Sequence, residues 1–184
     1  NGDVTAPGSV TDLGATSGRT IIGNISNDKI ELRELTRFPN NIIQTCNHFY
    51  WDIFALYNEI INGLKIVSKE NIEISSIGID TWGVDVVFVD GNGEILGNPY
   101  SYRDPSTIGA PERLFKKISK EVVYSKTGIQ IMNFNTLYQL FTEEQRGCQS
   151  LKSADKILFM PDALSYMLTG NMVTEYTIAS TSQM

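Results

Sequence analysis

The fold is decided by residues 11–25, TDLGATSGRTIIGNI, in which two short apolar segments flank a turn made of small residues. This pattern predicts a β-hairpin. Residues 29–35, KIELREL, then alternate apolar and charged side chains with period two, as a strand with one face in water does. Together the two stretches predict three antiparallel strands.

Outward from this hairpin, the apolar pattern changes to helical and then to buried-strand segments. Apolar residues three or four apart predict helices, and short β-branched runs predict buried strands. In chain order the pattern predicts a helix over 51–69, buried strands over 74–79 and 84–89 that meet at a polar corner, a second helix from Pro111 to just before Gly128, and helices near 137–141 and 161–168. This order indicates an α/β fold, a mixed sheet with antiparallel edge strands and covering helices.

The domain organisation is simple. Residues 1–9 are polar, contain Gly2, Pro7 and Gly8, and follow neither period, so we interpret them as an altered or tail segment. Residues 10–184 show no linker, repeat or low-complexity segment and are predicted to be one unit.

Composition excludes several classes of protein. The formal net charge is −6 and the only adjacent basic pair is Lys116-Lys117, so nucleic acid is not an expected partner. No apolar run approaches the roughly 18 to 20 residues that span a bilayer, so a membrane is not an expected partner either. Cys46 and Cys148 are far apart, and His48 is the single histidine, which argues against zinc and hydrolase motifs. A cytoplasmic enzyme of small-molecule metabolism fits these features.

The first candidate site is the segment 12–19, which holds Asp12, two glycines, two hydroxyls and Arg19. Glycines let a backbone approach an anion, while N–H groups, hydroxyls and a guanidinium donate to phosphate oxygens. A carboxylate beside such a turn can hold Mg²⁺ through water. The alternative is an ordinary hairpin turn with local Ser and Thr hydrogen bonds. Neither the P-loop nor the dinucleotide glycine motif is present.

The second candidate site is the corner that contains Asp80, Thr81, Trp82, Gly83 and Asp85. Carboxylates accept hydrogen bonds from polyol hydroxyls, an aromatic face packs on their C–H side, and strand ends of open α/β sheets bind ligands. The segment therefore fits half of a sugar pocket. A capped strand with a buried tryptophan is the equally weighted alternative.

Three further groups have structural alternatives that the residues alone favour. Arg103 and Asp104 could pair with each other or face a polar ligand, and Phe134 and Asn135 could contact substrate or cap a helix. Asp162 stands in a predicted first helical turn, where it could serve the helix dipole.

Taken in order, these segments resemble the N-terminal part of the FGGY family of carbohydrate kinases, within the actin, hexokinase and heat-shock ATPase superfamily. The resemblance runs from about Thr11 to the last residue, and its matching segments are 12–19, 76–85, 102–104, 125–130, 134–140, 160–162 and 168–170. It implies a ribonuclease H-like, actin/hexokinase-type ATPase domain.

The resemblance also implies an activity: transfer of the ATP γ-phosphate to the terminal hydroxyl of L-rhamnulose, which gives L-rhamnulose 1-phosphate in rhamnose catabolism. The residues that match the family's ATP phosphate loop are Ala15, Thr16, Ser17, Gly18 and Arg19, and Asp12 matches its Mg²⁺-associated aspartate. The residues implied at the sugar site are Gly83, Asp80, Thr81, Trp82, Asp85, Arg103, Asp104, Phe134, Asn135 and Asp162.

No residue of this chain matches the family's catalytic aspartate, and the family's C-terminal nucleotide-binding domain has no counterpart here. The resemblance therefore implies a fragment, residues 10–184 of an N-terminal kinase domain, without turnover of its own. Two alternatives stay open. One is another kinase of the family, such as a fuculokinase, xylulokinase or glycerol kinase. The other is a non-catalytic carbohydrate-binding module that stacks sugars on Trp82, Tyr102 and Phe134.

Overall fold

The structure is a computed structural model that describes residues 7–26 and 29–184, and its contacts group into two compact units. The first unit contains the described residues up to Asn41 together with residues 53–82, and the second contains residues 42–52 and 83–184. The residue pattern along the chain does not predict this division. Most of the segment interpreted as a tail, residues 1–6, lies outside the described residues, and the first strand begins at Gly8.

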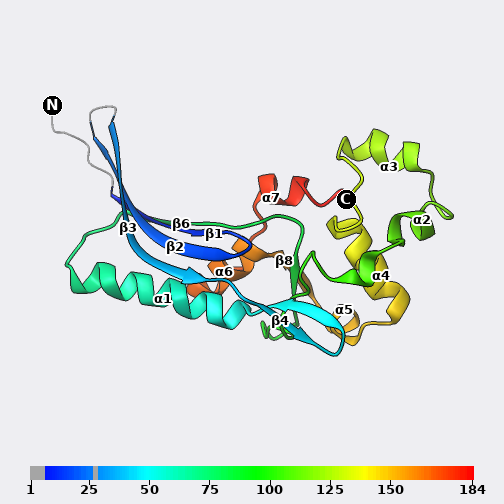
Figure 1. The fold of residues 1–184 in the computed structure, drawn as a ribbon, viewed down its shortest axis with the longest axis horizontal. Coiled ribbons are helices and arrows are strands. Elements are labelled where there is room, and N and C mark those ends of the chain that lie inside the picture. The colour runs from blue at the N-terminus through cyan, green and yellow to red at the C-terminus, as the bar shows by residue number, and fades with distance from the viewer. Residues whose placement is uncertain (1–6, 27–28) are drawn as a thin grey trace. The chain divides into compact units, whose positions relative to one another are not determined.

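A four-stranded sheet with one covering helix forms the first unit (Figure 1). The strand order is β3-β2-β1-β6, with β1 antiparallel to β2 and parallel to β6. The elements are β1 (Gly8–Leu13), β2 (Ser17–Ser26), β3 (Lys29–Pro39), α1 (Ile53–Lys69) and β6 (Ser76–Asp80). The predicted hairpin, third strand and first helix are confirmed.

Helix α1 packs its apolar face against the sheet at very short range. Ile53, Leu56 and Ile60 are buried, as the three-to-four residue spacing predicts. Gly63 lies so close to β2 that a Cβ built on it would be 2.2 Å from Oγ1 of Thr20. The absence of a side chain at position 63 therefore sets how closely the helix approaches the sheet.

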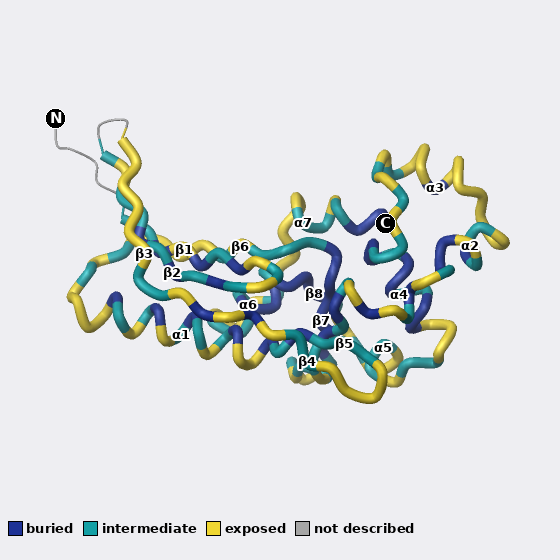
Figure 2. The backbone as a smooth tube through the Cα atoms, in the orientation of Figure 1, coloured by how far each residue is buried: buried dark blue, intermediate teal, exposed yellow. Residues whose placement is uncertain are grey.

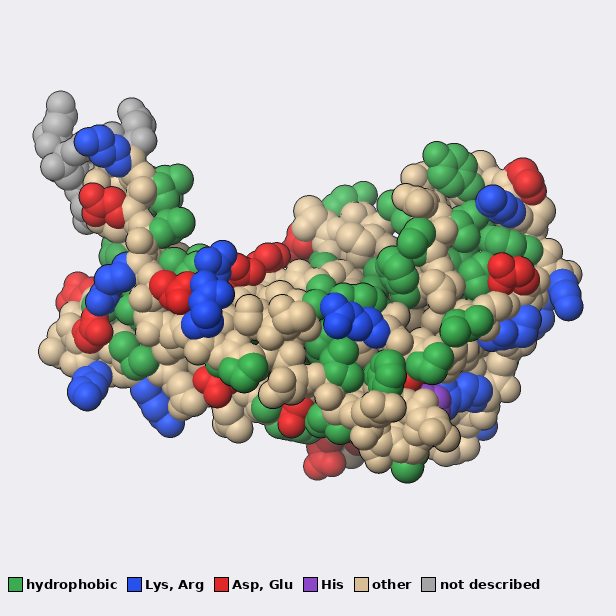
Figure 3. Space-filling view, in the orientation of Figure 1, with side chains coloured by type: hydrophobic (Ala, Val, Ile, Leu, Met, Phe, Trp, Pro, Cys, Tyr) green, Lys and Arg blue, Asp and Glu red, His purple; other side chains and the backbone are tan. Residues whose placement is uncertain are grey.

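The outer parts of this sheet are exposed. Ile25, Ile30 and Leu32 lie near the end of the β2–β3 hairpin with more than half of their surface accessible, and the tube there is largely yellow in Figure 2. Hydrophobic side chains gather beside this hairpin in Figure 3. The strand predicted over 74–79 is present as β6, but β6 is largely exposed, so its predicted burial is wrong. Within the described residues β6 is an edge strand with β1 as its sole neighbour, which explains its exposure.

The second unit combines two small antiparallel sheets with helices. Its core includes Val87, Val89, Leu158, Met160 and Leu164. The strands are β4 (Ile42–Thr45) paired with β5 (His48–Trp51), and β7 (Val86–Val89) paired with β8 (Lys156–Phe159). The helical elements are η1 (Pro105–Thr107), α2 (Ala110–Leu114), α3 (Lys120–Thr127), α4 (Thr136–Arg146), α5 (Gln149–Ser153), α6 (Met160–Thr169) and α7 (Tyr176–Ser180).

The single helix predicted from Pro111 to Gly128 is wrong, because the structure divides it into α2 and α3. Ser119 caps the second piece, since its hydroxyl accepts a hydrogen bond from the Val122 N–H at 3.3 Å. The predicted helices near 137–141 and 161–168 are confirmed as α4 and α6. Across the described ranges, 7–26 and 29–184, the helices are all too short or too polar to cross a bilayer.

Candidate functional site

The candidate phosphate loop is a tight turn between β1 and β2, formed by residues 14–17, which we name the 14–17 turn. Leu13 is the last residue of β1 and pairs with Gly18 of β2. One residue further along the chain, the Gly14 N–H donates to the Ser17 carbonyl at 2.9 Å. Ala15 and Thr16 form the tip. The predicted hairpin is thus present, and the residues proposed for phosphate contact stand at its end.

Asn40, which the sequence analysis missed, holds this turn from outside. Its side-chain Nδ2 donates to the Gly14 carbonyl at 2.9 Å, and its backbone N–H donates to the Thr16 carbonyl at 3.0 Å. The Asn40 residue is buried. A lone asparagine after Pro39 carries no recognisable motif, so its role follows from the fold alone.

Gly18 serves packing in this turn. A Cβ at position 18 would lie 2.4 Å from the Phe38 ring and 2.6 Å from Cδ2 of Leu13, both buried. A glycine is required there by the contact between neighbouring strands, whatever ligand the turn binds.

Asp12, Arg19 and Asp80 lie on one face of the first unit's sheet, at the carboxyl ends of β1 and β6. Asp12 is opposite Arg19 in the antiparallel pair and opposite Asp80 in the parallel pair, and directly paired residues share a face. This face is opposite the one that α1 covers, because Thr11 and Leu13 point into the core. The parallel register brings together two carboxylates that are 68 residues apart in sequence.

Arg19 forms an ion pair with one oxygen of the Asp12 carboxylate. Arg19 Nη2 lies 2.8 Å and Arg19 Nε 2.9 Å from Asp12 Oδ2, with both side chains more than a third exposed. The other oxygen, Oδ1, accepts no hydrogen bond from any residue that the structure describes. Arg19 also approaches Glu34 at 3.9 Å, and Glu34 pairs with Arg37. A continuous row of alternating charges therefore runs across these three strands.

This donor set fits a hydrated Mg²⁺ in part. Mg²⁺ keeps several waters and takes one or two carboxylates, which the open Oδ1 of Asp12 and the neighbouring Asp80 can supply. The described residues contain no group of three or more His, Cys, Asp or Glu side chains arranged to hold a metal. The remaining ligands of a bound Mg²⁺ would have to be water and substrate oxygens.

In the second unit, the candidate sugar segment begins with a strained turn. The Asp85 N–H donates to the Gly83 carbonyl at 3.0 Å, and Val84 between them has a φ of 71°. This is a γ-turn with positive φ, a rare and strained conformation, here at a β-branched residue. Such strain is kept when surrounding contacts over-determine it, and it clusters at functional sites.

Helix α4 provides those surrounding contacts. The Thr136 hydroxyl donates to the Val84 carbonyl at 2.7 Å, and Nε2 of Gln139 donates to Oδ1 of Asp85 at 2.8 Å. Both side chains are buried. Sequence reasoning singled out this helix start for Phe134 and Asn135, and missed the two residues that hold the turn.

Asp85 is completely buried and fully engaged. Besides Gln139, its carboxylate accepts from Nε1 of Trp51 at 2.6 Å and from the Tyr102 N–H at 3.1 Å, both at Oδ2. A buried carboxylate needs several donors to offset its desolvation. The geometry thus gives Asp85 a role in joining β5, the 83–85 turn and α4.

The remaining residues of the predicted half-site, Asp80, Thr81 and Trp82, belong to the first unit. Asp80 is exposed, and the Thr81 hydroxyl donates to the Trp82 carbonyl at 2.8 Å. The chain passes from the first unit to the second between Trp82 and Gly83. The predicted sugar residues are therefore divided between the two units.

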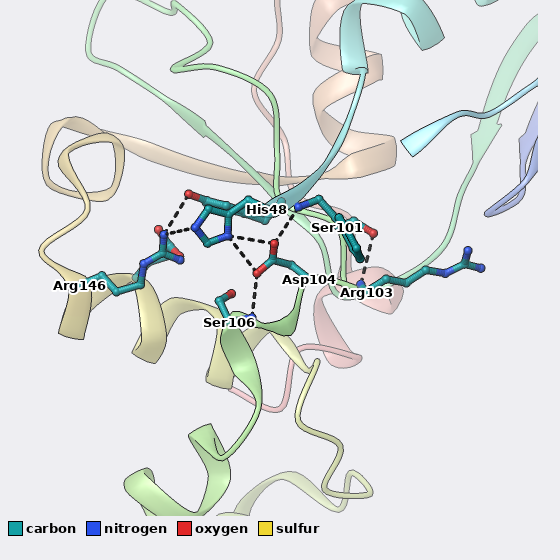
Figure 4. Close-up of polar contacts among 9 residues, drawn as sticks. His48, Ser101, Arg103, Asp104, Ser106 and Arg146 are labelled. Carbon is teal, nitrogen blue, oxygen red and sulfur yellow. Dashed lines mark hydrogen bonds and ion pairs between the residues drawn. The ribbon is translucent and has the colours of Figure 1, made fainter. Parts of the chain in front are cut away.

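Arg103 lies over one ring of an aromatic group in the second unit. The Arg103 guanidinium carbon lies 5.5 Å from the centre of the Tyr102 ring, which in turn contacts Phe134 and Trp51 at centroid distances of 5.8 and 6.0 Å. Figure 4 shows the Arg103 side chain directed away from Asp104, so the two residues do not form the pair that sequence proximity suggested. Arg103 is exposed and keeps its charge at the surface.

Asp104 is buried and acts as a local structural acceptor (Figure 4). It accepts from the N–H groups of Phe49 at 2.8 Å and Ser106 at 2.9 Å, and it lies 3.0 Å from Nδ1 of His48. Burial raises the pKa of the Asp104 carboxyl, but these hydrogen bonds together hold it below its ordinary value. The carboxylate thereby ties strand β5 to η1.

His48 connects Asp104 to Arg146, a second contact that sequence reasoning missed. Nη2 of Arg146 lies 2.9 Å from Nε2 of His48, and Nη1 lies 3.0 Å from the buried Glu143. A guanidinium has donors only, so Nε2 must accept and Nδ1 must carry the proton that goes to Asp104. The geometry assigns the neutral Nδ1–H tautomer to His48.

Asn135 and Asp162 are both buried. Asn135 occupies the N-cap position of α4 without a side-chain cap, and its Nδ2 donates instead to the Gln130 carbonyl and to Gln183. Asp162 Oδ1 accepts from the Glu175 N–H at 3.2 Å, while its Oδ2 has no partner within the described structure. Burial, together with the Glu175 charge, raises the pKa of Asp162.

The second unit also contains a cavity of about 360 Å³. It is lined by side chains of β4, β5 and β7, among them Ile43, Tyr50 and Phe88, and by Tyr100 and Cys148. None of the predicted sugar residues lines it.

Solved structures with the same arrangement of elements are sugar kinases. Gluconate kinase from Lactobacillus acidophilus matches with a TM-score of 0.84, covering 98% of this chain and 36% of that chain at 17% identity. Glycerol kinase from Plasmodium falciparum matches with a TM-score of 0.74, covering 97% and 38% at 19% identity. At these identities the likeness concerns the fold alone, and it confirms the predicted actin/hexokinase-type fold.

Sequence comparison then narrows the class. The model of the FGGY family of carbohydrate kinases, N-terminal domain, matches residues 9–184, and this chain belongs to that family. It is 60% identical over 173 residues to a rhamnulokinase of Bacteroides thetaiotaomicron, covering 94% of this chain and 36% of the relative. A rhamnulokinase of Ligilactobacillus salivarius is 46% identical over the same share of this chain and 35% of the relative. The chain thus spans about a third of the length of these relatives.

Proposed function

We propose that this chain is the N-terminal part of an ATP-dependent kinase that converts L-rhamnulose to L-rhamnulose 1-phosphate. The observation that carries the proposal is 60% identity, over 94% of the chain, to a protein named rhamnulokinase. A cytoplasmic location is part of the proposal, as is the assignment of residues 10–184 to the kinase domain. Residues 1–9 are proposed as an altered or tail segment, of which Gly8 and Ser9 begin strand β1.

The 14–17 turn and its flanks are proposed to bind the ATP phosphates, through Ala15, Thr16, Ser17, Gly18 and Arg19. Phosphoryl transfer depends mainly on positioning the phosphate and neutralising its charge. Backbone N–H groups at the turn and the Arg19 guanidinium are suited to that task. Asp12 would hold Mg²⁺ through its open oxygen, and the ion would screen phosphate charge when bound.

Gly83 is proposed as the main contact with the sugar. A Cβ at this position would lie 3.1 Å from the Thr181 hydroxyl, so any side chain would crowd the strained 83–85 turn. Arg103 and Phe134, with Asp80, Thr81 and Trp82, are proposed as further contacts with the sugar. Asp85, Asp104, Asn135 and Asp162 are buried, and we propose that they support the sugar site through the hydrogen bonds described above.

The test uses a full-length kinase that contains residues 1–184. ATP- and Mg²⁺-dependent ADP release should be faster with L-rhamnulose than with L-fuculose, xylulose, glycerol or gluconate. Equal rates with another of these acceptors would overturn the substrate assignment, whereas no release with any of them would overturn the kinase assignment. Tight sugar binding in calorimetry without any ATP turnover would instead favour a carbohydrate-binding module.

A further inference from the structure

We infer that Asn40 is a positioning residue of the 14–17 turn, holding the turn's carbonyl groups in place so that its N–H groups are presented to a nucleotide phosphate. The inference rests on the proposed function for the identity of the anion. It adds a residue that neither the sequence motif nor the family match singles out.

The contacts of Asn40 are specific to the turn. One residue supplies two donors, Nδ2 to the Gly14 carbonyl at 2.9 Å and the backbone N–H to the Thr16 carbonyl at 3.0 Å. Asn40 follows the last register pair of β2 and β3, Ser17 with Pro39, so the strand pair that carries the turn also delivers the residue that holds it. With Asn40 buried, water has little access to compete for these bonds.

The conformation of the turn explains why outside support is needed. Two-residue hairpin loops favour turns with positive φ, which match the twist of the strands. Gly14, Ala15 and Thr16 are all absent from the residues of positive φ in the described chain. The turn therefore lacks the favoured hairpin geometry, and the two hydrogen bonds from Asn40 compensate for it.

Holding the carbonyls has a consequence for anion binding. A peptide plane that flips would direct the Gly14 or Thr16 oxygen toward a phosphate, where like partial charges repel. With both oxygens bonded to Asn40, flipping either plane breaks a buried hydrogen bond. The peptide plane of the Gly14 carbonyl also carries the Ala15 N–H, which has no acceptor among the described residues and stays available to a ligand.

The experiment compares three variants of a full-length kinase that contains this chain. Asn40→Ala removes the Nδ2 donor, and Asn40→Asp keeps the shape but replaces the donor with an oxygen that faces the Gly14 carbonyl. Asn41→Ala is the matched control, since Asn41 is the adjacent residue of the same type and is exposed. The measurements are the separate KM values for ATP and sugar, kcat, and hydrogen exchange of the peptide that spans residues 12–19.

For both Asn40 variants, we expect kcat/KM for ATP to fall about tenfold, with sugar KM within twofold of the unsubstituted protein. Hydrogen exchange over residues 12–19 should accelerate, and Asn41→Ala should change neither quantity. An Asn40→Asp variant with unchanged ATP kinetics would overturn the inference, because filling space would then suffice. Unchanged exchange in Asn40→Ala would overturn it too, even in a protein that proved not to be a kinase. If only the proposed function is wrong, the unsubstituted protein will show no ATP turnover, but hydrogen exchange over residues 12–19 will still accelerate in Asn40→Ala.

Discussion

Arg19 and Asp12 form an ion pair between the two strands that lead into and out of the 14–17 turn, with Arg19 Nη2 and Nε at 2.8 and 2.9 Å from one carboxylate oxygen. Both groups are assigned to ATP binding in the proposed function. Without a nucleotide they neutralise each other, and a bound triphosphate would offer Arg19 a second anion. The pair is thus placed to exchange partners when the site fills.

Replacing Arg19 should separate function from stability. Arg19→Gln should reduce ATP-dependent turnover by roughly 10- to 100-fold, because a charged phosphate donor is lost. The free energy of unfolding should change by less than about 1 kcal/mol, since exposed ion pairs contribute little. Steady-state kinetics and urea unfolding check both parts. Arg37→Gln is the control, because Arg37 pairs with Glu34 on the same strand row; an equal loss of turnover there would argue for a general field effect.

The close approach of α1 to the sheet predicts a packing defect on substitution. Gly63→Ala places a Cβ 2.2 Å from Oγ1 and 2.8 Å from Cγ2 of Thr20, so it should lower the free energy of unfolding by roughly 1–3 kcal/mol despite the better helix propensity of alanine. Adding Thr20→Ala should recover part of this loss, because it removes Oγ1 and Cγ2 and leaves only the Thr20 Cβ, 2.8 Å away, in the crowded position. Gly78→Ala is the control, since its Cβ would meet the Val10 side chain at an ordinary 3.9 Å. Additive effects in a double-mutant cycle would contradict the packing argument.

The buried carboxylate of Asp85 should contribute to the stability of the fold rather than to contact with the substrate. Asp85→Asn leaves one acceptor oxygen for donors from Trp51, Gln139 and Tyr102, and turns an N–H group toward a donor. The expected loss is about 2–4 kcal/mol in chemical unfolding. Asp90→Asn, at a turn where the hydrogen bonds to the carboxylate are exposed, should have a much smaller effect. An Asp85→Asn protein of full stability but raised sugar KM would instead assign Asp85 to substrate contact.

Asp104 should contribute to acid stability. Its pKa is held below the ordinary value, so its stabilising contribution is complete above the unfolded pKa of about 4 and is lost as pH falls through the folded pKa. Asp104→Asn should therefore flatten the fall in Tm on the acid side of pH 4. Thermal unfolding from pH 2.5 to 7 measures it. The same slope in the variant would mean that other carboxyls carry the acid transition.

The contribution of Asp162 to stability should have the opposite pH dependence. Burial raises its pKa, so the native state binds the proton more tightly than the unfolded chain, and stability declines as pH rises from the ordinary carboxyl pKa through the raised one. Asp162→Asn keeps an acceptor for the Glu175 N–H and removes the charge. We expect an equal or higher Tm at pH 7 and a shallower pH dependence between pH 4 and 7. A lower Tm at pH 7 would show that Oδ2 has a partner in solution.

How much the sequence predicted depends on the range of the interaction. Period-two alternation in residues 29–35 and the spacing of apolar residues in 51–69 are local signals, and both elements formed as expected. The helix predicted from Pro111 to Gly128 divided at Ser119, because a local cap prevailed over a run of apolar residues that fitted one helix face. Strand β6 was predicted to be buried from its composition, but burial depends on neighbouring strands, which composition does not reveal.

By itself, the sequence determined the hairpin of residues 11–25, the order of strands and helices, and the list of chemically suited residues, since these depend on residue type and spacing within a few turns or strands. Only the tertiary structure decided which carboxylates are available. Asp12 and Asp80 are paired in a parallel register at the exposed strand ends. Asp85 and Asp104 are buried and already accept hydrogen bonds from neighbouring residues. It also placed Asn40 on the 14–17 turn, because hydrogen-bond partners far apart in the chain are chosen by strand register and packing.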